Sequence, residues 1–360
     1  IVEFARGLTK LGVKIISTSN TARLLEKNKI KVTHVSEITK FPEMLDGRVK
    51  SLHPNIFAGI LADRKSKKHL TELKKQKINL IDIVVVNFYP FEETIRKINK
   101  INEVIENIDI GGPSLARAAA KNYQNVLVVT GPGDYSDVLE KIKSRKIDEK
   151  YRQALAAKAF SMTAHYDSLI NRYFNGLGKN DYPGLLNLTF RKIQDLRYGE
   201  NPHQSAAFYR DIFAEQGFVS TARQLHGKEL SYNNILDVDA AFELVKEFEK
   251  PSAAVIKHTN PSGVASAEKI EDAYIKAHEA DPKSAFGCIV ALNRNCNLEI
   301  ARYMKPLFIE AVICPKFEKD ALKLLKEKKN LRLLETGAIK KLKNKYDLRK
   351  VTGGLLAQME

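Results

Sequence analysis

Short apolar runs that alternate with amphipathic helical patterns restrict most strongly how this chain can fold. Residues 80–90 (LIDIVVVNFYP), 125–130 (NVLVVT) and 253–258 (AAVIKH) are apolar along most of their length. Such runs are typical of strands in parallel sheets, which helices cover on both faces. Helical patterns at 91–99 (FEETIRKIN) and 240–250 (AAFELVKEFEK) alternate with these runs. The sequence therefore predicts an α/β protein built around a parallel sheet.

The alternation divides into two segments joined by a helical stretch. Residues 1–131 hold the first set of predicted strands and helices, and residues 187–360 hold the second. A helical extension and a linker containing Pro183 occupy residues 132–186. The first predicted helix, closed by Gly12, has no strand before it, and the first residue is not methionine. A parallel layer normally starts on a strand, so we expect the natural protein to begin earlier.

Composition excludes some functions and leaves others open. No run of about 18 apolar residues occurs, so a membrane span is not expected. Three cysteines without zinc-like spacing fit a reducing, cytoplasmic setting. The net charge of +16 is compatible with nucleic-acid binding, with small anionic substrates, or with lysine-rich solvated helices such as 65–77, and we favour the last two. The glycine motifs of nicotinamide-binding and P-loop proteins are absent from the sequence.

Two segments in the first half can contribute to an anion site. Residues 17–21 (STSNT) follow a predicted strand and begin a helix, where backbone N–H groups and hydroxyls can cradle phosphate. Residues 47–54 (GRVKSLHP) add Arg48, which can bind a phosphate or carboxylate through two hydrogen bonds, and Lys50, which can move a proton. Taken singly, the first segment could be plain helix capping by residues 19–21, and the second a surface loop.

A glycine pair between two ionisable groups makes residues 108–121 (IDIGGPSLARAAAK) the sharpest motif. Gly111 and Gly112 let the backbone approach a ligand closely. Asp109 precedes this turn, and Lys121 lies further along the helix that Pro113 can start. An aspartate and a lysine in one pocket can act as an acid/base pair, each shifting the pKa of the other. The competing interpretation is a surface salt bridge.

Three motifs in the second segment join polar side chains to turns. They are residues 196–204 (LRYGENPHQ), 230–237 (LSYNNILD) and 255–263 (VIKHTNPSG). The last one ends an apolar strand with Lys257 and His258, at a carboxyl end where open α/β sheets place ligands. Adjacent residues of a regular strand face opposite ways, so both can serve one pocket only if the strand has ended there. As an isolated signal, His258 would more often be a structural histidine.

Taken together and in this order, these motifs closely resemble those of the bifunctional purine-biosynthesis enzymes that join AICAR transformylase to IMP cyclohydrolase. The resemblance implies a methylglyoxal-synthase-like cyclohydrolase domain over residues 1–131 and the first, cytidine-deaminase-like part of a transformylase domain over residues 187–360. It implies formyl transfer from 10-formyltetrahydrofolate to AICAR, which gives FAICAR, and dehydrative closure of FAICAR to IMP. The resemblance implies no metal, and residues 314–317 (CPKF) agree with this because they lack the zinc-ligand pattern of the deaminases.

The resemblance also assigns roles to residues at matching motif positions. In the first segment it implies catalysis or orientation by Lys50, Tyr89, Asp109 and Lys121, with proton transfer by the last two. Substrate-binding positions there would be Thr18, Ser19, Asn20, Thr21, Arg48, Ser51, Asn87 and Ile110. In the second segment it implies His258 as proton acceptor, assisted by Lys257. The nucleotide would be contacted by Arg197, Tyr198, Asn234, Gly287 and Glu310.

Further expectations follow from the resemblance. Ser19 and Asn20 stand where the family usually has two glycines, and a first strand and a second transformylase subdomain should lie beyond the two ends of this chain. This chain alone is therefore expected to be defective in formyl transfer. The partners implied are small-molecule nucleotides and folate, without nucleic acid or membrane, in a cytoplasmic homodimer. The alternative function is a non-catalytic nucleotide-sensing module with the methylglyoxal-synthase-like fold.

Overall fold

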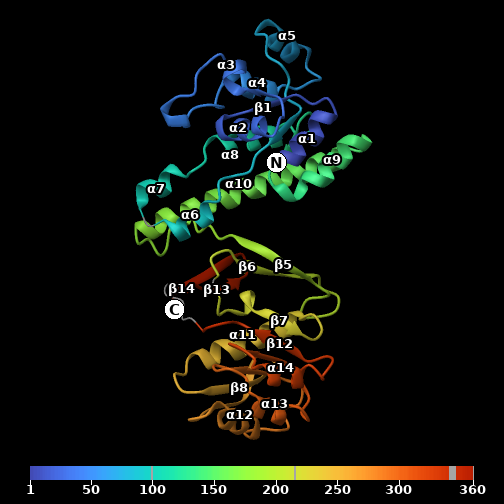
Figure 1. Ribbon diagram of the computed structural model, residues 1–360. Helices are drawn as coiled ribbons and strands as arrows, with labels where there is room; N and C mark the ends of the chain where they lie inside the picture. Colours follow the sequence, from blue (N-terminus) through green and yellow to red (C-terminus); the bar gives the residue numbers. More distant parts are fainter. Residues whose placement is uncertain (99, 215, 340–345, 360) are drawn as a thin grey trace. The chain divides into compact units, whose positions relative to one another are not determined.

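The computed structural model describes residues 1–98, 100–214, 216–339 and 346–359. The chain forms two compact units, Ile1–Thr189 and Phe190–Glu360, here called unit 1 and unit 2. Figure 1 traces both units in sequence colours, from blue in unit 1 to red in unit 2. Each unit is described by itself.

Unit 1 contains short parallel strand pairs surrounded by helices. Strand β1 (Ile15–Ser17) pairs with β2 (Val32–His34), and β3 (Ile83–Val85) pairs with β4 (Leu127–Val129), both in parallel. The predicted parallel pairing is confirmed, but these two pairs are not joined to each other by ladder hydrogen bonds. The α-helices are α1 (Val2–Lys10), α2 (Ser19–Lys27), α3 (Val35–Thr39), α4 (Pro54–Leu61), α5 (Lys67–Lys75), α6 (Phe91–Lys97), α7 (Ile101–Glu106), α8 (Gly111–Lys121), α9 (Tyr135–Ser144) and α10 (Glu149–Leu177). Short 3-10 turns cover Leu45–Gly47 and Pro132–Asp134.

Small side chains pack α8 between the strands and α10. Ala116 and Ala119 of α8 and Ala159 of α10 are fully buried in one apolar cluster with Val128 and Val129 of β4. Alanine lets two helices and a sheet approach closely, which places the first turn of α8 beside the ends of the strands. The long helix predicted after residue 150 therefore belongs to the core of unit 1.

Unit 2 is built on a six-stranded mixed sheet with the order β7-β12-β11-β10-β8-β9. Its strands are β7 (Arg223–His226), β8 (Ser252–Lys257), β9 (Asn260–Ser266), β10 (Cys288–Leu292), β11 (Ile309–Cys314) and β12 (Arg332–Glu335). Strands β10, β11 and β12 run parallel, whereas β8 is antiparallel to β10. Two hairpins flank the sheet in sequence, formed by β5 (Phe190–Leu196) with β6 (Ala206–Asp211) and β13 (Tyr346–Val351) with β14 (Gly354–Met359).

Helices cover both faces of this sheet, as the apolar runs predict. Successive strand residues point to opposite faces. One face packs Ile256, Ile289 and Ile313 against α11 (Tyr232–Lys246). The other packs Val255, Val290 and Val312 against residues of α12 (Ile270–Glu279), α13 (Leu298–Met304) and α14 (Lys319–Leu325). A short 3-10 turn, Val219–Thr221, precedes β7 in this unit.

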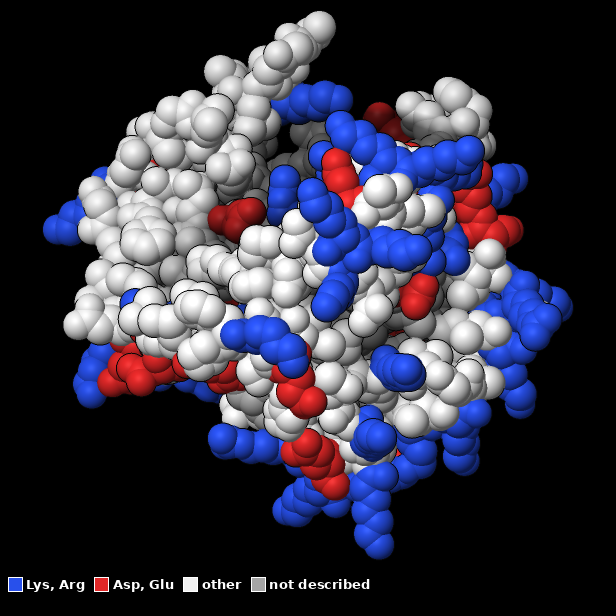
Figure 2. All heavy atoms as spheres, turned by 90° about the horizontal axis from the view of Figure 1, so that it is seen from above, with Lys and Arg blue, Asp and Glu red and all other residues white. Residues whose placement is uncertain are grey.

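The surface carries its positive charge over a wide area. In the face drawn in Figure 2, Lys and Arg side chains lie along the right and lower edges with Asp and Glu side chains among them. This distribution supports the interpretation of solvated lysine-rich helices. Among the described residues, the helices are all too short or too polar to cross a membrane.

Gly263 tests the packing of unit 2. A side-chain carbon at this position of β9 would lie 1.8 Å from the carbonyl oxygen of Ala277 in α12. Because that neighbour is backbone, Gly263→Ala must separate the strand from the helix. We expect a loss of about 2 kcal/mol in the free energy of unfolding, measured by urea denaturation. Gly354→Ala, where the nearest atom lies at 3.4 Å, should change stability little; equal effects of the two variants would contradict the packing.

Two candidate active sites

Two distant segments of unit 1 meet at the first turn of α8. A side-chain carbon at Gly111 would lie 3.1 Å from the hydroxyl of Ser51, which is itself buried. The guanidinium of Arg48 forms a two-hydrogen-bond ion pair with Glu106 at the end of α7. The GRVKSLHP loop is therefore held against the segment that contains Asp109, and Gly111 leaves little space beside the Ser51 hydroxyl where they touch.

Asp109 is the buried ionisable group of this site. Its backbone N–H donates to the hydroxyl of Tyr166 at 2.7 Å, and its carboxylate accepts the N–H of Gly112 at 2.9 Å. Burial raises the pKa of Asp109, while the Gly112 N–H and the positive charge of Lys50 act in the opposite direction. A carboxyl group with a raised pKa beside an amine is a candidate for proton transfer.

The loop after β1 forms the start of α2. Thr18 is the N-cap residue, one position before the residues that the sequence predicted as caps, and its side chain makes no capping hydrogen bond. Asn20 and Thr21 lie exposed in the first turn, and the side chain of Ser19 lies outside the described part of the chain. The backbone N–H groups of this turn are available to an anion.

Residues after β3 line the same region of unit 1. The amide of Asn87 and the hydroxyl of Tyr135 hydrogen-bond to each other, with N···O and O···O distances of 2.7 and 2.9 Å. Tyr89 is 50% exposed, and it influences the pKa of Tyr166 together with Asp109. Ile110, the N-cap residue of α8, is 59% exposed. Tyr89 and Ile110 thus offer exposed surface beside the buried carboxyl of Asp109.

Lys121 and Asp109 lie at opposite ends of α8. Lys121 is the last residue of α8, whereas Asp109 precedes the first, and an eleven-residue helix is about 16 Å long. Arg117, between them on the helix, lies over the ring of Phe160 in α10, 5.6 Å from its centre. The predicted acid/base pair of Asp109 and Lys121 thus spans the length of α8, and their shared pocket stays a prediction. The amine that acts on Asp109 is that of Lys50.

The predicted residues of unit 2 gather at one edge of its sheet. The amine of Lys257, the last residue of β8, donates to the carbonyl of Phe286 at 2.9 Å, next to Gly287 and the start of β10. Cys288 of β10 pairs with Ile309 of β11 and the following residue pairs with Ala311, which leaves Glu310 in a bulge. A bulge redirects a side chain and is frequent beside functional sites.

The carboxylate of Glu310 connects several predicted residues. It accepts a hydrogen bond from the amide of Asn234 at 2.8 Å. The guanidinium of Arg332, in β12, lies 3.6 Å from it. Burial lowers the pKa of Arg332; Glu310 opposes this shift and Arg197 reinforces it. Arg197 and Tyr198, which follow β5, therefore lie close to the same charged group.

Strand β8 has ended at His258, as a shared pocket with Lys257 requires. His258 and Thr259 both have left-handed backbone angles, with φ of +53° and +60°. The His258 side chain is exposed, and Lys257 is partly buried. Lys257 and Glu310 both affect the pKa of the buried thiol of Cys288. Burial raises the pKa of that thiol to about 12, the charge of Lys257 opposes the rise, and Glu310 reinforces it.

The position of this site relative to the sheet differs from the simple expectation. Lys257 and His258 do lie at the carboxyl end of their own strand. Because β8 runs antiparallel, however, this is the edge at which the parallel strands β10, β11 and β12 begin. The ligand-binding rule for carboxyl ends of parallel strands therefore points to the opposite edge.

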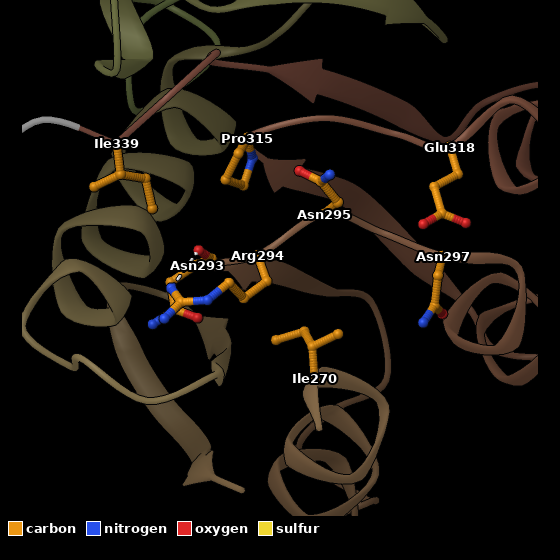
Figure 3. Close-up of a pocket in the computed structure, with 8 residues that line it drawn as sticks. All are labelled: Ile270, Asn293, Arg294, Asn295, Asn297, Pro315, Glu318 and Ile339. Atoms are coloured by element: carbon orange, nitrogen blue, oxygen red, sulfur yellow. Dashed lines mark hydrogen bonds between the residues drawn. The ribbon is translucent and has the colours of Figure 1, made fainter. Parts of the chain in front are cut away.

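A cavity of about 550 Å³ lies at that opposite edge. Figure 3 shows Asn293 and Arg294 on one side of it, Glu318 and Asn297 on the other, and Asn295 between them. Asn293 is committed to the fold, because its amide donates to three backbone carbonyls. Arg294 likewise donates to the carbonyls of Asn293 and Glu249. The cavity contains none of the residues predicted for the site.

Several residues of these sites have no signal in the sequence. Tyr166 lies in the middle of the long helix α10, and Arg332 begins an ordinary apolar strand. The exposed rings of Phe286 and Phe308, 4.9 Å apart, lie beside Gly287 and offer a surface on which a planar ring can stack. Each becomes part of a site only through contacts between distant segments. The described residues contain no group of three acidic, His or Cys side chains placed to hold a metal ion.

The fold thus divides the chain into two α/β units, and each unit brings together several of the residues predicted for a site. The family model of the MGS-like domain matches residues 1–114. The family model described as the AICARFT/IMPCHase bienzyme matches residues 119–360. The chain belongs to this bienzyme family.

Curated relatives agree with this assignment along the whole chain. The bifunctional purine biosynthesis protein PurH of Acetivibrio thermocellus is 53% identical over 99% of this chain and 71% of its own length. The protein of the same name from a Thermoanaerobacter species is 52% identical, over 99% of this chain and 70% of its own length. That of Ruminiclostridium cellulolyticum is 50% identical, over 99% and 71%. The protein is thus similar throughout to bifunctional enzymes of purine biosynthesis.

The raised pKa of Asp109 gives a test by pH. The native carboxyl holds its proton above the ordinary pKa of 3.8, so the native state binds more protons than the unfolded state in the interval just above that value. The stability of the wild type relative to Asp109→Asn should therefore fall as pH rises above about 4. Urea denaturation across this range measures the difference. A difference that stays constant or grows with pH would contradict the burial of this carboxyl.

Proposed function

We propose that unit 1 carries the cyclohydrolase site of this bienzyme and that unit 2 carries residues of its transformylase site. The observation that carries the first assignment is the meeting of Lys50 and Ser51 with Asp109 and Gly111. Relatives of this chain are named for purine biosynthesis. We accordingly assign residues 1–131 to the cyclohydrolase domain, 132–186 to the helical extension and linker, and 187–360 to the transformylase part.

Ring closure needs geometry and proton transfer more than an external reactant. The carboxamide nitrogen of FAICAR attacks its own formyl carbon, a C–N bond forms, and the formyl oxygen leaves as water. Because nucleophile and electrophile belong to one molecule, correct alignment supplies much of the acceleration. One proton must pass from the carboxamide nitrogen and one from the formamide nitrogen to the departing oxygen, which leaves as water.

The residues of unit 1 divide these tasks. Asp109, with its raised pKa, exchanges protons with the reacting atoms, and Lys50 stabilises the negative charge that develops on the formyl oxygen. The phosphate binds at the first turn of α2, to Thr18, Ser19, Asn20 and Thr21, with Arg48 and Ser51 on its other side. Asn87, Tyr89 and Ile110 orient the base. Lys121 acts from the far end of α8.

Formyl transfer in unit 2 depends on a base. The amine of AICAR is delocalised into its ring and carboxamide, so it attacks the formyl carbon of 10-formyltetrahydrofolate only when a group accepts its proton. As the new C–N bond forms, the bond from the formyl carbon to N10 of the folate breaks, and N10 takes up a proton to leave as tetrahydrofolate. We assign this role to His258, with Lys257 stabilising charge. Arg197, Tyr198, Asn234, Gly287 and Glu310 bind the nucleotide. The cosubstrate is folate-type, and we propose that the chemistry requires no metal.

The proposal extends to the assembly and the ligands of the protein. We infer a cytoplasmic homodimer that binds small nucleotides and folate and neither nucleic acid nor membrane. The exposed rings of Phe286 and Phe308 support this proposal, since apolar aromatic surface of this kind is usually covered by a ligand or a partner.

The two lysines of unit 1 can be compared by the same substitution. We expect Lys50→Met to lower kcat for IMP formation from FAICAR by about a hundredfold, because a group that stabilises developing charge is lost. Lys121→Met should lower it less than about tenfold, since Lys121 is remote from Asp109. The assay follows the absorbance of IMP at saturating FAICAR. The reverse order of effects would contradict the assignment, and tight nucleotide binding without turnover in the wild type would favour a nucleotide sensor.

The division of labour between the units is tested at His258. In the full-length protein, His258→Ala should reduce formyl transfer from 10-formyltetrahydrofolate to AICAR by about a thousandfold, the range typical of a lost general base. Cyclisation of added FAICAR by the same preparation should be unchanged, because unit 1 keeps all its residues. Parallel loss of both activities would instead indicate a general defect in folding.

A further inference from the structure

The turn that carries His258 is held in an unfavourable conformation. Both His258 and Thr259 have left-handed backbone angles, with φ of +53° and +60°. For residues with a β-carbon this region costs about 1 kcal/mol or more each, and β-branched threonine is especially disfavoured there. Two such residues in succession persist only where surrounding contacts impose them.

One carboxylate supplies such contacts from another element. Asp237, in α11, accepts the backbone N–H of Thr259 at 2.7 Å on one oxygen and that of His258 at 3.3 Å on the other. Within the turn, the hydroxyl of Thr259 and the amide of Asn260 both donate to the carbonyl of His258, at 2.7 and 2.8 Å. Charge-assisted bonds to two successive N–H groups fix the orientation of the peptide unit between them.

The elements on both sides of this contact are rigidly packed. Val238 and Phe242 of α11 are fully buried, as are Val255 and Ile256 of β8. Both pairs belong to the sheet core, so neither Asp237 nor the end of β8 can shift freely. The carboxylate thus ties the turn to a fixed helix, while the imidazole of His258 itself remains exposed.

We propose that Asp237 is a positioning residue for formyl transfer, which sets the backbone of His258 so that its imidazole faces the same site as Lys257. This inference rests on the proposed role of His258 as proton acceptor. Asp237 acts through the turn and does not touch the substrate. Without it, the turn relaxes toward extended backbone and the imidazole leaves the position from which it accepts the proton.

The test compares Asp237→Asn with a control of equal charge change. Asparagine keeps one acceptor oxygen but turns an N–H donor toward a second N–H, so the paired contact is lost. In the full-length protein we expect kcat for formyl transfer to fall by about tenfold to a hundredfold, with KM for AICAR changed less than about twofold. Asp272→Asn, an exposed acid in the first turn of α12, should leave both unchanged. Cyclohydrolase activity of each preparation reports on folding.

A second variant separates positioning from simple loss of stability. Thr259→Gly removes the cost of the left-handed angle, so in the Asp237→Asn background it should restore kcat by about threefold or more. Hydrogen exchange of the His258 and Thr259 amides should be about tenfold faster in Asp237→Asn than in Asp272→Asn. Unchanged kcat, or a rise in KM alone, would overturn the inference.

Failure of the proposed function has a different signature. If the wild type shows no formyl transfer, the role of His258 is what has failed. Hydrogen exchange then decides the placement: accelerated exchange of the two amides in Asp237→Asn supports Asp237 as the residue that holds the turn, and unchanged exchange overturns it.

Discussion

The contact between the GRVKSLHP loop and the first turn of α8 is the constraint on which unit 1 depends. A side-chain carbon at Gly111 would lie 3.1 Å from the hydroxyl oxygen of Ser51. A side-chain carbon at Gly112 would lie 2.3 Å from the carboxylate of Asp109. The backbone can close in this way because neither position has a side chain. The same closure buries Asp109 and raises its pKa. The close packing at Gly111 and Gly112 and the raised pKa of Asp109 therefore have the same cause.

Unit 2 reaches a comparable result with irregular backbone rather than glycine. Glu310 lies in a bulge of β11, and His258 lies in a left-handed turn directly after β8. Both departures occur at one edge of a sheet whose central strands β8, β10 and β11 are buried along most of their length. The regular part supplies the stability, and the departures redirect side chains toward a common region. Arg332 and Asn234 then hold the Glu310 carboxylate from two sides.

Much of this architecture can be predicted from local sequence, and particular residues show where that ends. The apolar run at 253–258 predicts a strand buried on both faces, and Val255 and Ile256 do face opposite helical layers. The direction of that strand is not local information, since β8 is antiparallel to its neighbour β10. For the same reason the sequence assigns Lys121 to a helix, whereas its separation from Asp109 depends on where α8 begins and ends. Tyr166 carries no signal of its own, because its hydroxyl becomes relevant only through the N–H of Asp109.

The sequence by itself determined the fold class, the family and the motifs that hold the candidate residues, because apolar periodicity and short glycine-rich motifs are properties of neighbouring positions. Only the tertiary structure decided which charges meet. Lys50 acts on Asp109, and Glu310 lies between Asn234 and Arg332, through contacts that join segments far apart in the chain. The physical reason is that a pKa depends on burial and on nearby charge in space, and neither distance nor burial is fixed by order along the chain.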